Sequence, residues 1–361
     1  MRILIDIGHP AHVHYFRNFI KIMEKKGHSF LIIAKNRNIT FKLLKFYDIP
    51  FIKRKDYPSS ILGKLWNIPI TDLFVIKKAR IFNPDIFMGF SGTHIAHAGK
   101  VLGIPSIVLD DTEHAKLAHL SYKSFATTIL TPNCFRKDFG EKHIRFDSYM
   151  ELCYLHKNYF TPENSILKIL GIKENERYAI LRFVSWGASH DVGHTGITLE
   201  NKIRAVKEIS KYSKVFISSE KKLPSELKQY QIEIPPERMH DALFFASLLF
   251  GESATMASEC AALGTPAIFI DNNGRGYTNE EEEKYNLVFN FTESLDNQVK
   301  AMEKAIEILK IDNLKNQWNI RRDVMLKEKI DITALMVWFI EEYPRSVKIM
   351  KEKPDYQYNF R

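Results

Sequence analysis

Short apolar runs that end in glycine or in polar loops alternate with helical patterns along most of the chain. Residues 2–7 (RILIDI) form the first run and lead directly into Gly8. A helical pattern follows, in which Phe16, Phe19 and Met23 share one face, and it stops at Gly27. Runs of this kind are typical of strands buried on both faces of a parallel sheet. Further strands are expected at residues 29–34, 85–89, 106–109, 126–130, 178–184, 214–218, 248–250 and 267–270.

This alternation predicts an α/β protein with two doubly wound parallel sheets, one in each half of the chain. The length of 361 residues also fits two domains of about 150 residues each. We place the first domain at residues 1–165 and the second at 166–335, next to the linker-like sequence TPENS (161–165). Residues 336–361 form a C-terminal helix and tail, and the long helical stretch 316–342 is a candidate to cross back to the first domain.

The composition favours a soluble protein of the cytoplasm. The longest apolar stretch, residues 242–250, is far shorter than the ~18 residues that a membrane span requires. The N-terminal sequence MRILIDIGHP has an acid where a signal peptide needs an apolar core. The 3 cysteines have no CxxC spacing, which argues against a disulfide scaffold and against a cysteine zinc site.

The net charge of +9 is concentrated in the first half of the chain. Residues 1–165 contain 24 lysines and arginines against 14 acids, whereas the rest of the chain is nearly balanced. A basic half can attract nucleic acid, an anionic membrane or an acidic ligand, and it can equally be a solvated surface.

The strongest motif for chemistry lies at residues 250–267, where a strand runs into Gly251, Glu252 and Ser253 and a helix begins at once. The free amides and the dipole of such a helix start form a site for an anion and suit a diphosphate. Thr255 can add a hydroxyl, and Glu259 lies one turn deeper on the same face, where a carboxylate could bind a ribose. An ordinary helix N-cap at Ser253 is the alternative.

This segment resembles the donor half of GT-B glycosyltransferases, with Glu259 and the sequence LGTP (263–266) in the matching places. The resemblance extends to the first half through IGHPAHVH (7–14), through PDIFMGFSG (84–92) and through LGIP (102–105). The N-acetylglucosaminyltransferase that completes the lipid-linked peptidoglycan precursor has similar features, and non-hydrolysing UDP-N-acetylglucosamine 2-epimerases share the architecture. The pair RFVSWGASHD (182–191) and DDTEH (110–114) resembles an uncharacterised GT-B-like family whose members often accompany polysaccharide-assembly genes.

The resemblance implies a fold of two Rossmann-like domains that face each other across a cleft. The first domain would take the acceptor and the second would bind the nucleotide-sugar donor. Arg182 would face the phosphates and offset charge on the leaving nucleoside diphosphate. The other expected substrate-binding residues are Gly251, Glu252, Ser253, Thr255, Met256, Glu259, Pro236, Met239, His190, Asn272 and Arg275.

A transferase needs a base for the acceptor hydroxyl, and histidine titrates near neutrality. We expect His12 to be this base and Asp110 to be the second candidate. His9, His12 and His14 lie in one loop, but HxH without a defined third or fourth ligand is weak support for a metal, so no metal or other cofactor is expected.

These observations favour a metal-independent, inverting glycosyltransferase that moves a sugar from a UDP-linked donor to a glycan or lipid-linked acceptor in cell-surface polysaccharide assembly. Lysines around the apolar residues 61–68 suit docking on the inner face of a membrane, or else form an ordinary amphipathic helix. One alternative is an isomerase of the 2-epimerase type, for which Asp110, Asp111, Glu113 and His190 could supply the polar groups. A non-catalytic protein that binds nucleic acid or a membrane surface is the other, and nucleic acid is the less expected partner.

Overall fold

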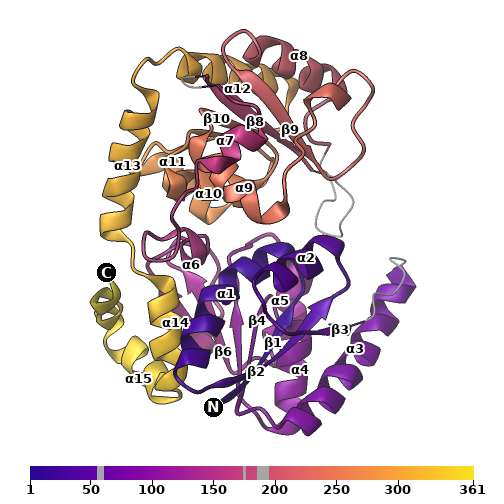
Figure 1. Cartoon of the computed structure of the whole chain (residues 1–361). Coiled ribbons are helices and arrows are strands. Elements are labelled where there is room, and N and C mark those ends of the chain that lie inside the picture. The colour runs from indigo at the N-terminus through magenta and orange to yellow at the C-terminus, as the bar shows by residue number, and fades with distance from the viewer. Residues whose placement is uncertain (55–60, 174–175, 185–194) are drawn as a thin grey trace. The chain divides into compact units, whose positions relative to one another are not determined.

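The computed structural model describes residues 1–54, 61–173, 176–184 and 195–361, and the side chains of 61–66 are not part of the description. The chain forms two compact units (Figure 1). Unit 1 consists of Met1–Tyr154 and Lys329–Arg361, and unit 2 consists of Leu155–Glu328. The first crossing between units therefore lies some ten residues before the predicted boundary at 165, and the C-terminal segment of unit 1 begins at Lys329 rather than at 336.

Unit 1 is built on a seven-stranded sheet in the order β3-β2-β1-β4-β5-β6-β7. All neighbouring strands in it run parallel. The strand order reverses between β1 and β4, which is the point where open α/β sheets bind ligands. The strands are β1 (Arg2–Ile7), β2 (Ser29–Lys35), β3 (Ile52–Arg54), β4 (Ile86–Phe90), β5 (Ser106–Leu109), β6 (Thr128–Pro132) and β7 (His143–Phe146).

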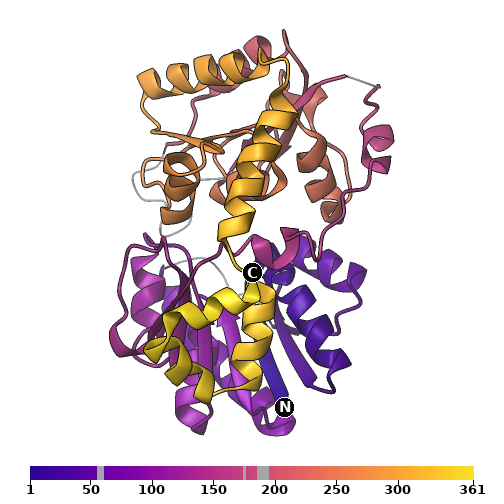
Figure 2. The same ribbon diagram turned by 90° about the vertical axis from the view of Figure 1, so that its left-hand side faces the viewer.

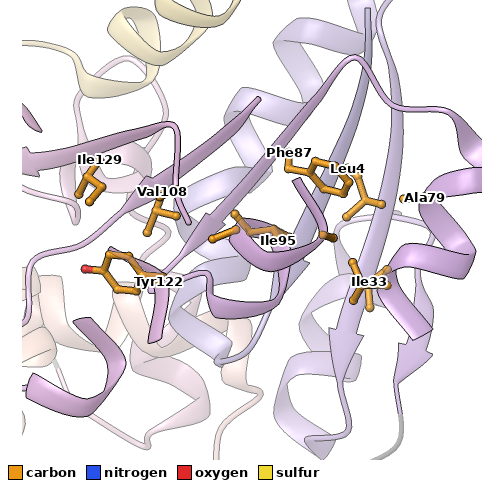
Figure 3. Close-up of a cluster of buried hydrophobic side chains, with 12 residues drawn as sticks. Leu4, Ile33, Ala79, Phe87, Ile95, Val108, Tyr122 and Ile129 are labelled. Atoms are coloured by element: carbon orange, nitrogen blue, oxygen red, sulfur yellow. The ribbon is translucent and has the colours of Figure 1, made fainter. Parts of the chain in front are cut away.

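One apolar cluster runs across this sheet beneath its helices (Figure 3). Leu4, Phe87 and Val108 come from three adjacent strands, and Ile95 and Tyr122 come from helices that cover them. All five side chains have no exposed surface, so the continuous apolar runs of the sequence are explained by burial of the sheet. The helices of the N-terminal part are α1 (Pro10–Lys25), α2 (Asn38–Phe46), α3 (Ile61–Phe82), α4 (Thr93–Leu102), α5 (Lys116–Tyr122) and α6 (Leu152–Leu155).

The C-terminal segment completes unit 1 (Figure 2). Helix α14 (Ile332–Glu341) packs on α1, and α15 (Arg345–Glu352) packs next to β7. A 3₁₀ segment, η4 (Pro354–Phe360), follows. The predicted single helix 316–342 is wrong: α13 (Leu314–Glu328) ends in unit 2, and Asp331 starts a new helix by accepting a hydrogen bond from the amide of Ala334.

Unit 2 has a five-stranded parallel sheet in the order β12-β11-β10-β8-β9. Its strands are β8 (Tyr178–Phe183), β9 (Lys214–Ser219), β10 (Leu248–Gly251), β11 (Ala267–Ile270) and β12 (Val288–Phe291). Its other helices are α7 (Ser165–Ile169), α8 (Leu199–Ile209), α9 (Met239–Phe245), α10 (Ala254–Leu263), α11 (Gly276–Glu283) and α12 (Leu295–Leu309). The strand order reverses between β8 and β10, and the prediction of two doubly wound parallel sheets is thus confirmed.

In the described part of the chain, no helix combines the length and the apolar character that a bilayer span requires.

Candidate functional site

The candidate site of unit 2 begins at the carboxyl ends of β8 and β10, where the strand order reverses. Arg182 and Gly251 are direct partners in the sheet register, and the amide of Glu252 donates to the carbonyl of Arg182 at 3.0 Å. A Cβ on residue 251 would lie 2.0 Å from that carbonyl oxygen, far inside van der Waals contact. Only glycine permits this approach, and the chain turns here straight into α10.

Ser253 caps the first turn of α10. Ser253 Oγ accepts a hydrogen bond from the amide of Met256 at 3.3 Å, as an ordinary N-cap does. This amide is therefore occupied, and the expected contact of Met256 with a diphosphate is not available through its N–H. The amides of Ala254 and Thr255 belong to the first turn of the helix and have no acceptor within it, so their N–H groups point out of the helix end. The Ser253 O–H can still donate to an anion.

Arg182 lies half-buried beside this helix start and is held by two side chains. Its guanidinium donates to Ser218 Oγ at 2.9 Å and to Glu220 Oε1 at 2.7 Å. Burial lowers the pKa of Arg182, while the carboxylates of Glu220, Glu259 and Glu252 oppose this shift. Its Nε is buried and has no hydrogen-bond partner among the described residues. One donor of a fixed cation thus remains for an anionic ligand.

Glu259 lies one turn into α10 and is paired with a histidine that the sequence did not connect to it. Its Oε1 is 3.0 Å from Nε2 of His240, which is the second residue of α9. Both side chains are buried. The histidine fixes one carboxylate oxygen of Glu259.

Glu252 holds the backbone of unit 2 on either side of residues 185–194. Its two carboxylate oxygens accept from the amides of Val184 at 2.9 Å and Ile197 at 2.6 Å. Lys202 lies 3.6 Å from the same carboxylate. Both carboxylate oxygens thus accept from backbone amides, and the expected role of Glu252 in substrate binding stays a prediction.

The loop after β11 is held by its own aspartate. Asp271 Oδ1 accepts from the amides of Asn273 at 2.7 Å and Gly274 at 3.0 Å, and Arg275 lies 3.3 Å away. Asn272 is exposed, but its Oδ1 accepts from the amide of Glu293 at 2.9 Å. Asn272 and Arg275 therefore lie beyond a strand end as expected, in a loop that is already structured.

Two more of the expected substrate-binding residues lie where α9 begins. Pro236 begins the short helical turn η3 (Pro236–Arg238), and Met239 begins α9; both are half-buried. Arg238 ties this turn to Glu163 at 3.0 Å and to Asp241 at 2.7 Å. These ion pairs hold the backbone of the turn in place. His190, the remaining expected contact, lies outside the described residues.

In unit 1, His12 lies on the first turn of α1, next to the end of β1. Its ring is 5.0 Å from the ring of Phe90, which ends β4. Burial lowers the pKa of His12 well below its usual value of 6.5, with further lowering by the charges of His9, Arg37 and Arg54. The amide of Gly8 donates to Nδ1 at 3.2 Å, so the neutral ring carries its proton on Nε2. His12 thus presents an N–H donor and not the free lone pair of a base.

Asp110 is fully buried, with no exposed surface. Its carboxylate accepts from Ser91 Oγ at 2.8 Å, from the Tyr122 hydroxyl at 2.6 Å and from the amide of Thr112 at 2.9 Å. The Asp110 charge, after burial, raises the pKa of Tyr122 and keeps that phenol protonated as a donor. Asp110 therefore positions the loop after β5, and the geometry argues against it as the base that touches an acceptor.

The three histidines of the first loop do not converge on one point. His9 caps α1 by accepting from the amide of Ala11 at 3.3 Å, and His14 is buried with its ring 5.1 Å from that of Tyr154. Across the described ranges, no group of three or more His, Cys, Asp or Glu side chains has the arrangement of a metal site.

Comparisons with known proteins agree with the fold. The family model described as "Protein of unknown function (DUF354)" matches residues 1–274. An uncharacterized protein of Methanocaldococcus jannaschii is 25% identical over 284 residues, which cover 73% of this chain and 80% of that protein.

The UDP-GlcNAc 2-epimerase of Neisseria meningitidis, solved bound to UDP-GlcNAc, matches with a TM-score of 0.64 and 13% identity over 91% of this chain and 100% of that one. The spinosyn rhamnosyltransferase SpnG, solved with spinosyn aglycone, matches with a TM-score of 0.61 and 12% identity over 93% of this chain and 99% of that one. These likenesses confirm the predicted GT-B-like fold, which glycosyltransferases and UDP-GlcNAc 2-epimerases share.

Proposed function

Because the chain belongs to the DUF354 family, whose description assigns no function, we propose an activity from the chemistry of its own residues. We propose that it is a GT-B-type glycosyltransferase that takes a sugar from a nucleoside diphosphate, UDP in the first instance. The observation that carries this proposal is the corner of unit 2 where Arg182 lies beside the open amides of α10 and the His240–Glu259 pair.

Different residues of this corner can bind the diphosphate and the ribose of a nucleoside diphosphate. The amides of Ala254 and Thr255, the Ser253 hydroxyl and the Nε of Arg182 are donors for the diphosphate. As the bond to the sugar breaks, negative charge grows on the leaving diphosphate, and fixed donors stabilise that charge without reorganisation. Glu259 accepts from the ribose hydroxyls while His240 holds it in place.

Unit 1 supplies the acceptor side. His12 donates from Nε2 to an acceptor oxygen, and the charges of Arg37 and Arg54 nearby favour an anionic acceptor. The exposed apolar residues Leu73 (67%) and Ile81 (72%) on α3 alternate with exposed Lys77 and Arg80, a surface suited to an anionic membrane and hence to a lipid-linked acceptor. The side chains of 61–66, which include Trp66, lie outside the described residues. We propose a cytoplasmic location, and this surface supports the further proposal of contact with the inner face of the membrane.

The 2-epimerase type of isomerase is the competing function, and the burial of Asp110 weighs against it. Such an isomerase requires acids of the first domain to reach the sugar. Asp110 has no exposed surface, and the Asp111 carboxylate is buried and accepts from the Thr112 hydroxyl at 2.8 Å. Incubation with UDP-N-acetylglucosamine and no acceptor separates the two activities: an epimerase changes the sugar, whereas a transferase leaves it intact or hydrolyses it slowly.

Nucleotide binding is the direct test. A ligand at about 100 times its Kd stabilises the folded state by about 2.7 kcal/mol, so UDP should raise the melting temperature of the purified protein by several degrees. We expect Arg182→Ala and Glu259→Gln to weaken UDP binding at least tenfold. Glu283→Gln, an exposed position on α11, is the matched control and should bind UDP like the wild type. The proposal fails if UDP, GDP and dTDP all leave the melting temperature unchanged.

A further inference from the structure

A second polar site lies in unit 1, and its lining does not include His12. It is a pocket of about 800 Å³ between α5 and the loop that joins β6 to β7. Its lining includes four lysines, Lys116, Lys123, Lys137 and Lys142. Leu120 and Phe139 add apolar surface. The volume is that of a small-molecule site.

The four lysines of this pocket outnumber the two acids of its lining, Asp138 and Glu141. Asp138 is in the lining, but its carboxylate is 3.1 Å from Nδ1 of His143 and accepts from the amide of Gly140 at 3.0 Å. Glu141 is exposed. Throughout the described chain, none of the four lysines has a carboxylate oxygen within 4.0 Å. Like charges held this close without a counter-ion cost folding free energy, and a bound anion would remove that cost.

Two lysines of the pocket have hydrogen bonds: Lys142 donates to the carbonyls of Lys123 at 3.5 Å and Ser124 at 3.2 Å, and Lys137 contacts a histidine. The Nζ of Lys137 is 3.2 Å from Nδ1 of His119, which is buried. Since Nδ1 accepts from the ammonium group, the neutral ring of His119 carries its proton on Nε2, 3.7 Å from Asp110 Oδ2. Burial, together with the charges of Lys116 and Lys123, lowers the pKa of Lys137. Asp110, which the sequence suggested as a base, lies too far from this nitrogen for a hydrogen bond and acts on His119 through its charge.

We propose that this pocket binds a phosphate group, with Lys123 and Lys137 as its main ligands and Lys116 and Lys142 as flanking charges. Phosphate carries enough negative charge to pair with several ammonium groups, and Leu120 and Phe139 can cover the organic part of a phosphate ester. The site is independent of the nucleotide site proposed for unit 2. The phosphate belongs either to a soluble phosphate ester or to the headgroup of a lipid.

The test measures phosphate binding in the full-length protein with saturating UDP present, so that the unit 2 site is occupied if it exists. Glycerol 3-phosphate is the soluble probe. Its binding is measured by calorimetry and by the shift in the melting temperature of the protein. We expect saturable binding that the double variant Lys123→Ala/Lys137→Ala weakens at least tenfold. The double variant Lys25→Ala/Lys100→Ala removes the same charge from exposed positions of α1 and α4 and should bind within twofold of the wild type. Without ligand, the pocket variant should melt no lower than the wild type, because like-charge repulsion is relieved. If the double variant does not fold, Lys123→Ala alone, at an exposed position, gives the same comparison.

A second arm uses vesicles of phosphatidylcholine with and without phosphatidylglycerol. Loss of vesicle binding in the pocket variant, without binding of the soluble probe, assigns the site to a lipid headgroup. Loss of glycerol 3-phosphate binding in the pocket variant assigns the site to a free phosphate ester. The proposal is overturned if the wild type binds neither probe, or if the pocket variant and the control variant change binding equally.

Discussion

At the scale of single residues, the proton position on His12 determines what this side chain can do for an acceptor. Gly8 donates to Nδ1, so the ring offers only its Nε2–H. Glutamine at this position can also donate from a terminal nitrogen, whereas alanine cannot. We expect His12→Gln to keep kcat/KM for UDP release within about tenfold of the wild type, and His12→Ala to lose about 100-fold. If both variants are equally inactive, His12 is a base after all.

The same residue predicts a pH dependence of stability. The pKa of His12 is held well below 6.5 in the folded protein by burial and by positive neighbours. The unfolded chain therefore binds a proton that the folded chain does not, so stability is lost as the pH falls below about 6.5. We expect His12→Gln to lose less unfolding free energy than the wild type between about pH 7.5 and about pH 5.5. Urea unfolding at the two pH values measures this, and equal losses would contradict it.

The residues of the candidate site could be located from the sequence more readily than their roles could be assigned. The helix start after Gly251 and Glu259 on its next turn follow from local spacing, and the structure places them as expected. Glu252 accepts from two backbone amides, and these belong to the end of β8 and to the segment before α8, which are distant from Glu252 in the sequence. The pairing of His240 with Glu259 likewise joins two helices and has no local signature.

At the scale of elements, Glu252 connects β8 to the segment that leads into α8. Removal of its side chain takes the hydrogen-bond acceptor from two backbone amides and the nearby carboxylate from Lys202. Unsatisfied buried amides cost about 1–3 kcal/mol each, so Glu252→Ala should lower the unfolding free energy by about 3 kcal/mol. Glu283→Ala, at an exposed site, should change it by less than about 0.5 kcal/mol. Chemical denaturation compares the two variants, and equal effects would show that the carboxylate does not hold this connection.

Central strands were predictable because burial on both faces requires continuous apolar sequence. The strands β3, β7 and β12, which were not predicted, are three of the four terminal strands of the two sheets, and the fourth, β9, was predicted. β3 (IKR) and β7 (HIRF) contain charged residues and are only three and four residues long. An edge strand has one partner and one open side, so its sequence carries a weaker apolar signal. The break between α13 and α14 was missed for a different reason, since helical patterns lie on both sides of Asp331 with no Gly or Pro between them.

At the scale of the whole molecule, the chain leaves unit 1 after Tyr154 and returns to it at Lys329. The returning segment is attached to the first part of unit 1 by buried polar contacts. Lys329 lies 2.7 Å from Asp147 Oδ1, and Ser148 Oγ donates to the carbonyl of Ile330 at 2.8 Å. Unit 1 is therefore assembled from both ends of the sequence, and unit 2 from the continuous stretch between them.

This arrangement predicts that loss of the C-terminal segment damages unit 1 and spares unit 2. Helix α14 packs on α1 and buries five large apolar side chains, Ile332, Leu335, Met336, Phe339 and Ile340. Each contributes about 1.5–3 kcal/mol, and the sum is comparable with the 5–15 kcal/mol by which a typical domain is stable. In a chain that ends at Glu328, the amides of α1 and β1 should lose protection from hydrogen exchange, while those of β8 and β10 keep it and serve as the internal control. Unchanged protection in α1 would mean that residues 1–154 fold without the returning segment, and equal loss in both sheets would mean that the two units unfold together.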